Sequence, residues 1–145
     1  MYDNILVPTD GSEGAERAVD HAIELATQFG ATVHALYIVD TAAFVDLDEA
    51  GIESDALSAS LADRGQDAVD RIAERAEEAG VDAESSVQRG RPVGSILDYV
   101  GEHDIDVIVM GTRGRSGLDR LLLGSVTEKV VRKSRVPVLT VRRED

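Results

Sequence analysis

Ile105-Asp106-Val107-Ile108-Val109-Met110 runs directly into Gly111-Thr112-Arg113-Gly114, and Gly124-Ser125 follows ten residues after Gly114. The glycine spacing is G-x-x-G-x(9)-G-S, placed between an apolar strand pattern and the start of a helical pattern. Glycine lets backbone N–H groups approach an anion closely, because it has no Cβ and permits positive φ. A strand, a glycine-rich loop and a helix N-terminus are the usual phosphate-holding arrangement of α/β proteins. The stretch therefore predicts nucleotide binding.

Two better-known phosphate motifs do not fit this loop. A P-loop carries a lysine directly after its last glycine, whereas Ser125 and Val126 follow Gly124 and the next lysine is Lys129. The dinucleotide fingerprint belongs to the first turn between a strand and a helix, and this loop comes late in the chain. A glycine-rich loop taken alone can also be a tight turn with no ligand.

Apolar runs and helical patterns alternate along the whole chain. Strands are expected at 4–9, 32–39, 83–88, 107–110 and 137–141, and helices at about 15–29, 55–80, 92–100 and from 125 onward. Near-continuous apolar strands that alternate with helices predict a parallel sheet covered on both faces. The predicted fold class is therefore α/β, with a single doubly wound domain over residues 1–145.

The ends of the predicted helices carry capping signals. Ser12 or Asp10 can cap the first helix at its N-terminus, and Gly30 can end it. Ser125 and Glu128 form an S-x-x-E capping box at the start of the last helix.

Composition narrows the classes of function. The 145 residues carry 28 acidic and 15 basic side chains, a net charge of −13 that repels nucleic acid. No cysteine is available for a disulfide or a thiolate site, and no apolar run approaches membrane-spanning length. We expect a cytoplasmic protein with no membrane or nucleic-acid partner. Acidic excess with only two lysines predicts a halophilic protein, and an ordinary acidic protein is the alternative.

Three loops are expected to meet at the carboxyl edge of the sheet, because parallel strands end on the same side. They are 8–12, 39–40 and 111–125. Asp10 can accept a hydrogen bond from a ribose hydroxyl or hold a cation near phosphates, and it can equally be only a helix cap. Arg113 and Arg115 add positive charge, or pair with surface carboxylates.

The opening stretch 4–13, the segment 109–114 and the segment 124–130 together resemble the universal stress protein (UspA-type) family, and 137–139 resembles that family's closing strand. The resemblance covers the whole chain. It implies a five-stranded parallel sheet in the order 3-2-1-4-5, often in a homodimer joined along the last strand. A monomer whose last strand is shielded by the acidic segment 41–55 is the alternative.

The glycine spacing resembles the branch of this family that binds ATP, which implies an ATP-binding stress-response protein. Little or no turnover is expected, because the sequence shows no evident general base and no P-loop lysine. No catalytic residue is implied. Carried over residue by residue, the nucleotide-binding set is Pro8, Thr9, Asp10, Val39, Met110, Gly111, Arg113, Gly114, Gly124, Ser125, Val126 and Thr127. A metal site built from the protein alone is not expected, although Mg²⁺ can arrive with ATP near Asp10.

A slow ATPase or phosphotransfer enzyme on the same site is the alternative function. Asp10 and Asp119 are the only carboxylates that we would test as a base. The three histidines lie within helical or strand patterns and are expected at the surface or in packing: His21, His34 and His103. A phosphoacceptor receiver domain is excluded, because it needs clustered aspartates after the first strand and a lysine after the fifth.

Overall fold

The structure is a computed structural model that describes residues 1–12, 14–41, 54–112 and 124–142. The strands are β1 (Asn4–Thr9), β2 (Thr32–Asp40), β3 (Ala83–Gly90), β4 (Val107–Gly111) and β5 (Val138–Val141). The helices are α1 (Gly14–Phe29), α3 (Ser54–Glu78), α4 (Pro92–Glu102) and α5 (Ser125–Lys133). Every strand and helix expected from the sequence is present, with ends that differ by a few residues.

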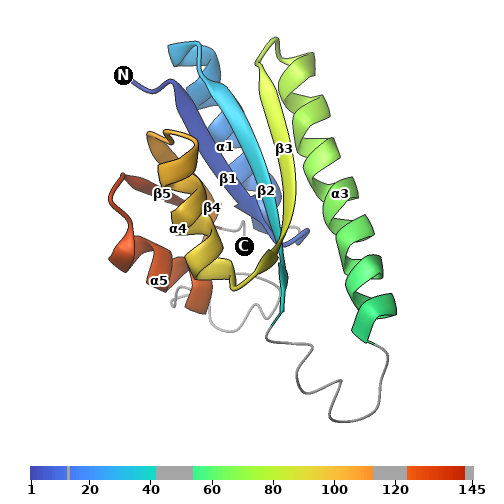
Figure 1. Ribbon diagram of the computed structural model, residues 1–145. Helices are drawn as coiled ribbons and strands as arrows, with labels where there is room; N and C mark the ends of the chain where they lie inside the picture. Colours follow the sequence, from blue (N-terminus) through green and yellow to red (C-terminus); the bar gives the residue numbers. More distant parts are fainter. Residues whose placement is uncertain (13, 42–53, 113–123, 143–145) are drawn as a thin grey trace.

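The five strands form a parallel sheet in the order β3-β2-β1-β4-β5, as predicted. β1 lies in the middle, with β2 on one side and β4 on the other (Figure 1). In chain order, β2 and β3 are added on one side of β1, and β4 and β5 are then added on its other side. The strand order therefore reverses between β1 and β4, and ligands of such sheets bind outside the carboxyl ends of the strands at this point.

The pairing of β1 with β4 is much shorter than its pairing with β2. β1 pairs with β2 over its full length, from Asn4↔Thr32 to Thr9↔Tyr37. With β4 it pairs only at Ile5↔Val107 and Leu6↔Ile108. The two central strands therefore part toward their carboxyl ends, which leaves space at that edge of the sheet.

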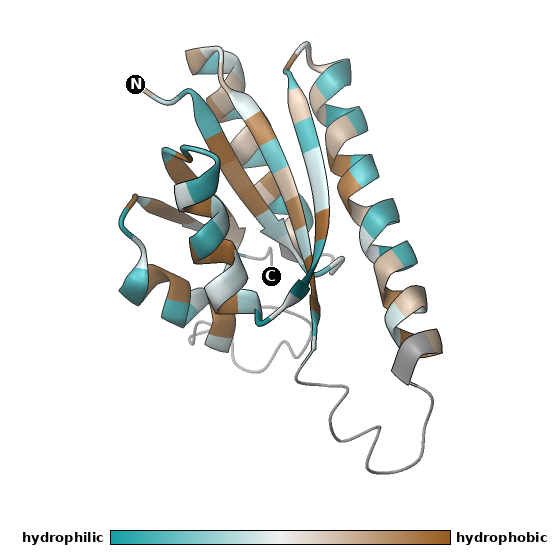
Figure 2. Ribbon diagram, viewed as in Figure 1, coloured by the Kyte–Doolittle hydropathy of each residue, from teal (hydrophilic) through white to brown (hydrophobic). Residues whose placement is uncertain are grey.

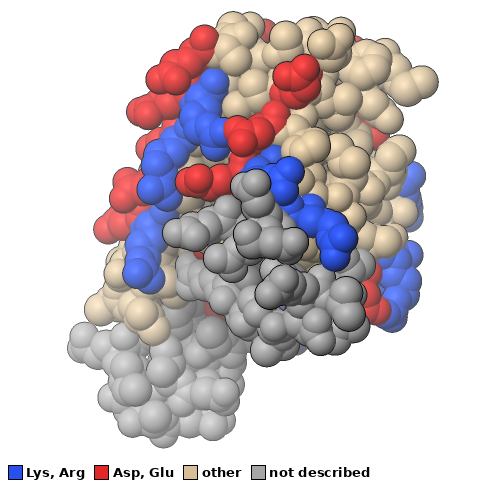
Figure 3. Space-filling model, turned by 180° about the vertical axis from the view of Figure 1, so that it is seen from behind, with Lys and Arg blue, Asp and Glu red and all other residues tan. Residues whose placement is uncertain are grey.

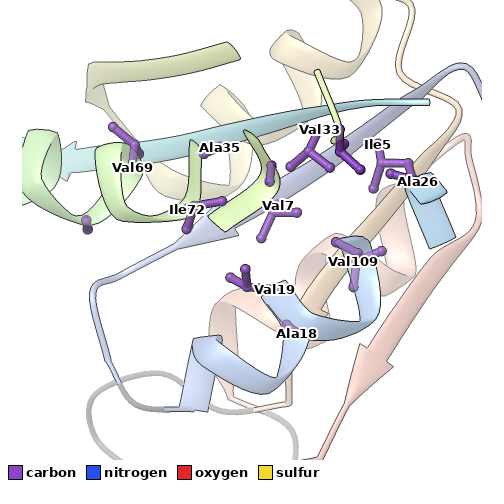
Figure 4. Packing of buried hydrophobic residues seen from close by; sticks show 14 of the residues in the cluster. Ile5, Val7, Ala18, Val19, Ala26, Val33, Ala35, Val69, Ile72 and Val109 are labelled. Atoms are coloured by element: carbon purple, nitrogen blue, oxygen red, sulfur yellow. The ribbon is translucent and has the colours of Figure 1, made fainter. Parts of the chain in front are cut away.

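Two layers of helices cover the sheet, with α1 and α3 on one face and α4 and α5 on the other (Figure 1). Side chains of a strand alternate between faces, so Ile5 and Val7 pack beneath α1 and α3 while Leu6 packs beneath α4 and α5. Figure 4 shows the first of these cores, where Val19 and Ala18 of α1 meet the sheet. Figure 2 shows β1, in the middle of the sheet, as mainly apolar and β3, at the sheet edge, as mixed.

Glycines end both long helices in the left-handed conformation. Gly30 follows α1 with φ +66° and Gly80 follows α3 with φ +77°. The next amide after each glycine bonds back into the helix, from Ala31 N to Ala26 O at 3.0 Å and from Val81 N to Ala76 O at 2.8 Å. This is the Schellman arrangement, and it confirms the predicted C-cap at Gly30.

The face formed by α1 and α3 carries acidic and basic side chains side by side (Figure 3). An ion pair between Arg75 of α3 and Asp20 of α1 joins the two helices across this face. Among the described residues, no helix is both long enough and apolar enough to cross a membrane.

Candidate functional site

A cavity of about 490 Å³ opens at the carboxyl ends of β1, β2 and β4, where the central strands separate. Its size lies within the ordinary range for small-molecule sites. The structure brings ten of the predicted residues together around it: Pro8, Thr9, Asp10, Val39, Met110, Gly111, Gly124, Ser125, Val126 and Thr127. The other two, Arg113 and Gly114, lie outside the described residues, as do Arg115 and Asp119.

The loop after β1 is folded by its own side chains. The Gly11 N–H donates to Thr9 Oγ1 at 3.0 Å, and the Ser12 N–H donates to Asp10 Oδ1 at 2.9 Å. Gly11 has φ +80°, a conformation that other residues rarely adopt. Asp10 therefore shapes the loop that leads into α1 and lines the cavity.

Ser12 also lines the cavity, and from the sequence it was expected only as a possible helix cap within the loop 8–12. Its carbonyl accepts the Ala15 N–H at 3.2 Å, but its hydroxyl caps nothing. The Oγ atom is buried and has no hydrogen-bond partner among the described residues. A buried hydroxyl without a partner is costly, and a bound ligand would supply the missing partner.

The end of β2 presents the carbonyl of Ile38 toward the cavity. The Thr32 N–H donates toward β1 (to Asp3 O, 2.9 Å), whereas the Val33 and Thr41 N–H groups donate toward β3. Since directions alternate along a strand, the backbone of Ile38 points toward β1 and that of Val39 toward β3. The ladder with β1 ends at Thr9↔Tyr37, and the Gly11 N–H is bonded to Thr9 Oγ1. The ladder therefore supplies no donor to the Ile38 carbonyl.

The first turn of α5 forms the opposite wall. Its first intrahelical bond runs from the Glu128 N–H to Gly124 O at 2.9 Å. The N–H groups of Ser125, Val126 and Thr127 precede this bond, and among the described residues nothing accepts from them. These amides, together with the positive end of the helix dipole, form a site suited to an anion.

The capping of this turn differs from the expectation. The N-cap is Gly124 rather than Ser125, no side chain caps the helix, and Glu128 forms an ion pair with Arg132. The predicted capping box is therefore wrong, because Gly124 occupies the N-cap and moves Ser125 into the helix. Gly124 has φ −63°, so glycine suits this position because it lacks a Cβ and not because it permits a positive φ.

Contacts hold the end of β4 against this turn. Thr127 is buried, and its hydroxyl donates to Gly111 O at 2.9 Å. The Gly124 N–H donates to Thr112 O at 2.6 Å. The end of β4 is thus bonded to the start of α5 twice, through Gly111 and Thr127 and through Thr112 and Gly124.

The rest of the lining is apolar and was not predicted from the sequence. It comes from helices as well as strands, and includes Ala15, Leu36, Tyr37, Leu61, Pro92 and Ile96. Asp10 and Asp40 are the carboxylates of the described lining, which holds no lysine or arginine. The described residues contain no group of three or more histidines and carboxylates that could hold a metal ion.

Comparison with known proteins places the chain in a family. The profile of the universal stress protein family matches residues 1–142. The chain is 40% identical to universal stress protein MJ0531 of Methanocaldococcus jannaschii over 99% of its own length and 84% of that protein. The chain belongs to the universal stress protein family.

Two solved structures share this fold. One is protein MJ0577 of the same organism, with a TM-score of 0.88 and 32% identity, covering 100% of this chain and 99% of the other. The other is a universal stress protein in complex with cAMP, with a TM-score of 0.69 and 29% identity, covering 97% of each chain.

Proposed function

We propose that this universal stress protein binds an adenine nucleotide, ATP in the first place, in the cavity at the carboxyl edge of its sheet. The observation that carries the proposal is the position of three amides at the start of α5, for which no described residue supplies an acceptor, across the cavity from the Ile38 carbonyl. The amides suit phosphate and the carbonyl suits a base with an amino group. The G-x-x-G-x(9)-G-S spacing, which the chain keeps in full, favours ATP over shorter nucleotides.

In this proposal each wall of the cavity has one task. The Ile38 carbonyl accepts a hydrogen bond from the exocyclic amine of adenine, and Asp10 accepts from a ribose hydroxyl. Ser125, Val126 and Thr127 hold phosphate oxygens through their N–H groups, and the Ser12 hydroxyl gains a partner. Mg²⁺ would reach the site with ATP, bound chiefly by phosphate and water. The ligand is a cytoplasmic metabolite, and we propose the cytoplasm as the place of action.

We expect ATP to bind with little or no turnover. Phosphoryl transfer needs cationic groups on the transferred phosphate and a residue that orients the nucleophile. The described lining offers no cation and, of the carboxylates, only Asp10 and Asp40. The protein would then act as a regulator whose nucleotide-bound state is read by a partner.

The test is calorimetric titration of the purified protein with ATP, GTP and cAMP, after denaturation and removal of any nucleotide that co-purifies. ATP should bind at least about tenfold more tightly than GTP, a difference of ~1.4 kcal/mol, since guanine carries an oxygen where adenine carries the amine. Phosphate release from the same sample should stay well below the ordinary enzyme range of roughly 1–10³ s⁻¹. Equal affinity for ATP and GTP would contradict the proposed hydrogen bond between the base and the Ile38 carbonyl. Absence of ATP binding would contradict the proposed function.

We also propose a homodimer joined along β5. This strand pairs only with β4 among the described strands, and Leu139 on it is 41% exposed. Val131 of α5 is another exposed apolar side chain, at 43%. A short apolar edge strand invites pairing with a second copy through a self-complementary two-fold interface.

Leu139→Lys is expected to convert this dimer into a monomer, because lysine on an edge strand opposes pairing. Val138 is the less suitable position, since its side chain packs against the core beneath α4 and α5. Light scattering in molar salt should give twice 15.5 kDa for the unchanged protein and 15.5 kDa for the variant. Leu57→Lys on α3, a position of similar exposure, is the control that should stay dimeric. A 15.5 kDa particle for the unchanged protein excludes the dimer.

A further inference from the structure

Lysine is rare in this chain and is confined to one helix. The sequence holds two lysines, Lys129 and Lys133, and both lie on α5, whose first turn forms one wall of the cavity. In a chain of net charge −13, residues 124–142 carry five basic side chains and one acidic side chain. This segment is therefore a basic part of an acidic protein, and it includes the turn proposed to hold phosphate.

The other basic side chains of α5 have local explanations. Arg132 forms an ion pair with Glu128, one turn earlier on the same helix. Arg132 and Lys133 also lie in the last turn of α5, where the negative end of the helix dipole favours cations. Lys129 is the fifth residue of the helix and lies away from that end. Neither explanation therefore applies to Lys129.

The surroundings of Lys129 on the helix contain no counter-ion. The neighbours at three and four positions before and after it are Ser125, Val126, Arg132 and Lys133. None of them is acidic, and the two cations among them oppose a further positive charge. Lys129 is exposed, and the part of the chain that the structure describes supplies neither an ion pair nor a hydrogen bond to its ammonium group. A positive charge at this position therefore adds nothing to the stability of the free protein, but an anion at the start of α5 would be attracted to it.

Helix geometry directs Lys129 toward the cavity end of α5. Lys129 follows Ser125 by four residues and Val126 by three, and both of these residues line the cavity. At about 100° and 1.5 Å per residue, it lies between them around the helix axis, with its Cα roughly 6 Å further along than that of Ser125. Helix side chains tilt toward the N-terminus, so the four-carbon stem of Lys129 can lead back over the first turn. The ammonium group can then reach an anion that extends from the amides of this turn toward solvent.

From this arrangement we propose that Lys129 binds the terminal phosphate of ATP and makes the site prefer ATP to ADP and AMP. The inference rests on the proposed function and names the residue that distinguishes nucleotides by the number of their phosphates. The amides at the start of α5 would hold the phosphates nearer the ribose, and the three donors of the ammonium group would meet the outermost one. An exposed lysine holds this phosphate in contact with water, and not in the water-excluded setting that accelerates phosphoryl transfer, so little turnover is still expected.

Arg91 provides a comparison, because it is a cation beside the cavity at the opposite end. It directly precedes Pro92, which lines the cavity, and its side chain is exposed. Gly90, the residue before it, pairs with Asp40 on the side of β2 that faces away from β1 and β4. Arg91 therefore lies near the proposed place of the base, and it tests whether any positive charge at the rim has the same effect as Lys129.

The test compares the dissociation constants of ATP, ADP and AMP by calorimetry, at a constant free Mg²⁺ concentration and the lowest salt at which all variants are folded. Lys129→Gln should weaken ATP binding by about fivefold, as expected for a charge-assisted contact at an exposed site, and change AMP binding by less than about twofold. Lys129→Arg keeps the charge and should retain most of the preference for ATP. Added salt should reduce the difference between the unchanged protein and Lys129→Gln, because it screens exposed charges.

Lys133→Gln and Arg91→Gln are the matched controls, since each removes one exposed positive charge. Both should leave the ratio of the AMP and ATP dissociation constants within about twofold of its original value. An unchanged ratio in Lys129→Gln, or an equal fall in Lys129→Gln and Lys133→Gln, overturns the role of Lys129 and leaves the proposed function standing. If the unchanged protein binds none of the three nucleotides, the proposed function fails, and this inference fails with it.

A second measurement observes the lysines directly. Reductive methylation with ¹³C-formaldehyde labels the two lysines and the N-terminal amine and keeps their positive charge, so the NMR spectrum contains few signals. Lys129→Arg and Lys133→Arg assign these signals. ATP should shift the signal of Lys129 and leave that of Lys133 in place, whereas AMP should shift neither. A Lys129 signal that responds equally to ATP and AMP, or to neither, excludes its contact with the terminal phosphate.

Discussion

Replacement of Gly124 by valine is expected to lower ATP affinity by at least about 100-fold, or ~2.7 kcal/mol. Gly124 lines the cavity and is the N-cap of α5, directly before the amides proposed to hold phosphate. Its φ of −63° and ψ of 157° are open to valine, so the backbone can keep its course. The loss would come from the branched side chain, which would occupy the space next to those amides.

The measurement is calorimetry with ATP on a variant whose circular dichroism and melting temperature show that it is folded. Gly101→Val is the matched control, because a Cβ at Gly101 on α4 meets no atom within 4 Å. The control should bind ATP as the unchanged protein does. Unchanged affinity in folded Gly124→Val would overturn the assignment of this turn as the phosphate end of the site.

Gly65→Ala should destabilise the protein by roughly 2 kcal/mol, although alanine is the better helix former by about 1 kcal/mol. Gly65 lies within α3 beside the ring of Tyr37, a buried residue of β2. A Cβ at this position would stand 2.4 Å from Tyr37 Cδ1 and 2.7 Å from Cγ. Neither the helix nor the ring can give way cheaply, because both belong to the packed core.

Denaturant unfolding with the same m-value measures this effect, and Gly101→Ala is the control of opposite sign. Alanine at Gly101 meets open space and should be neutral or slightly stabilising. Gly65→Ala in a Tyr37→Leu background should cost less than in the native background, since the clashing ring is gone. If Gly65→Ala and Gly101→Ala change the free energy of unfolding by the same amount, the contact with Tyr37 does not affect stability. Tyr37 also lines the cavity, so Gly65→Ala should weaken ATP binding as well.

The sequence predicted the fold through periodicity and family resemblance, and the residues of the loops around the cavity through their motifs. Contacts that depend on how the helices and strands pack together could not be predicted from the sequence. Tyr37, Leu61 and Ile96 belong to ordinary strand or helix patterns, and only the assembled layers place them at the cavity. His34 and Tyr99 are separated by 65 residues, and no local pattern in either segment indicates their hydrogen bond.

Two positions show the limit of local rules. The S-x-x-E motif at Ser125 is a genuine capping pattern, but the N-cap of α5 is Gly124. The hydrogen bond from the Gly124 N–H to Thr112 O is a contact that this local pattern does not include. Local rules also leave open which residue at the end of β2, Ile38 or Val39, offers its carbonyl to the cavity, because the direction of a strand carbonyl is set by its partner strands. The bonds of Thr32, Val33 and Thr41 settle that direction only once the pairing is known.

The brief pairing of β1 with β4 divides the sheet along its middle. Ile5↔Val107 and Leu6↔Ile108, together with the hydrogen bonds of Asp106 to Asp3 and Asn4, join the two halves, and α1 spans the seam between them by packing on both strands. A ligand bound between the ends of these strands would link the two halves of the sheet. Its binding should therefore slow deuterium uptake on both sides at once, in β1 and in β4, and not only in the loops that touch it.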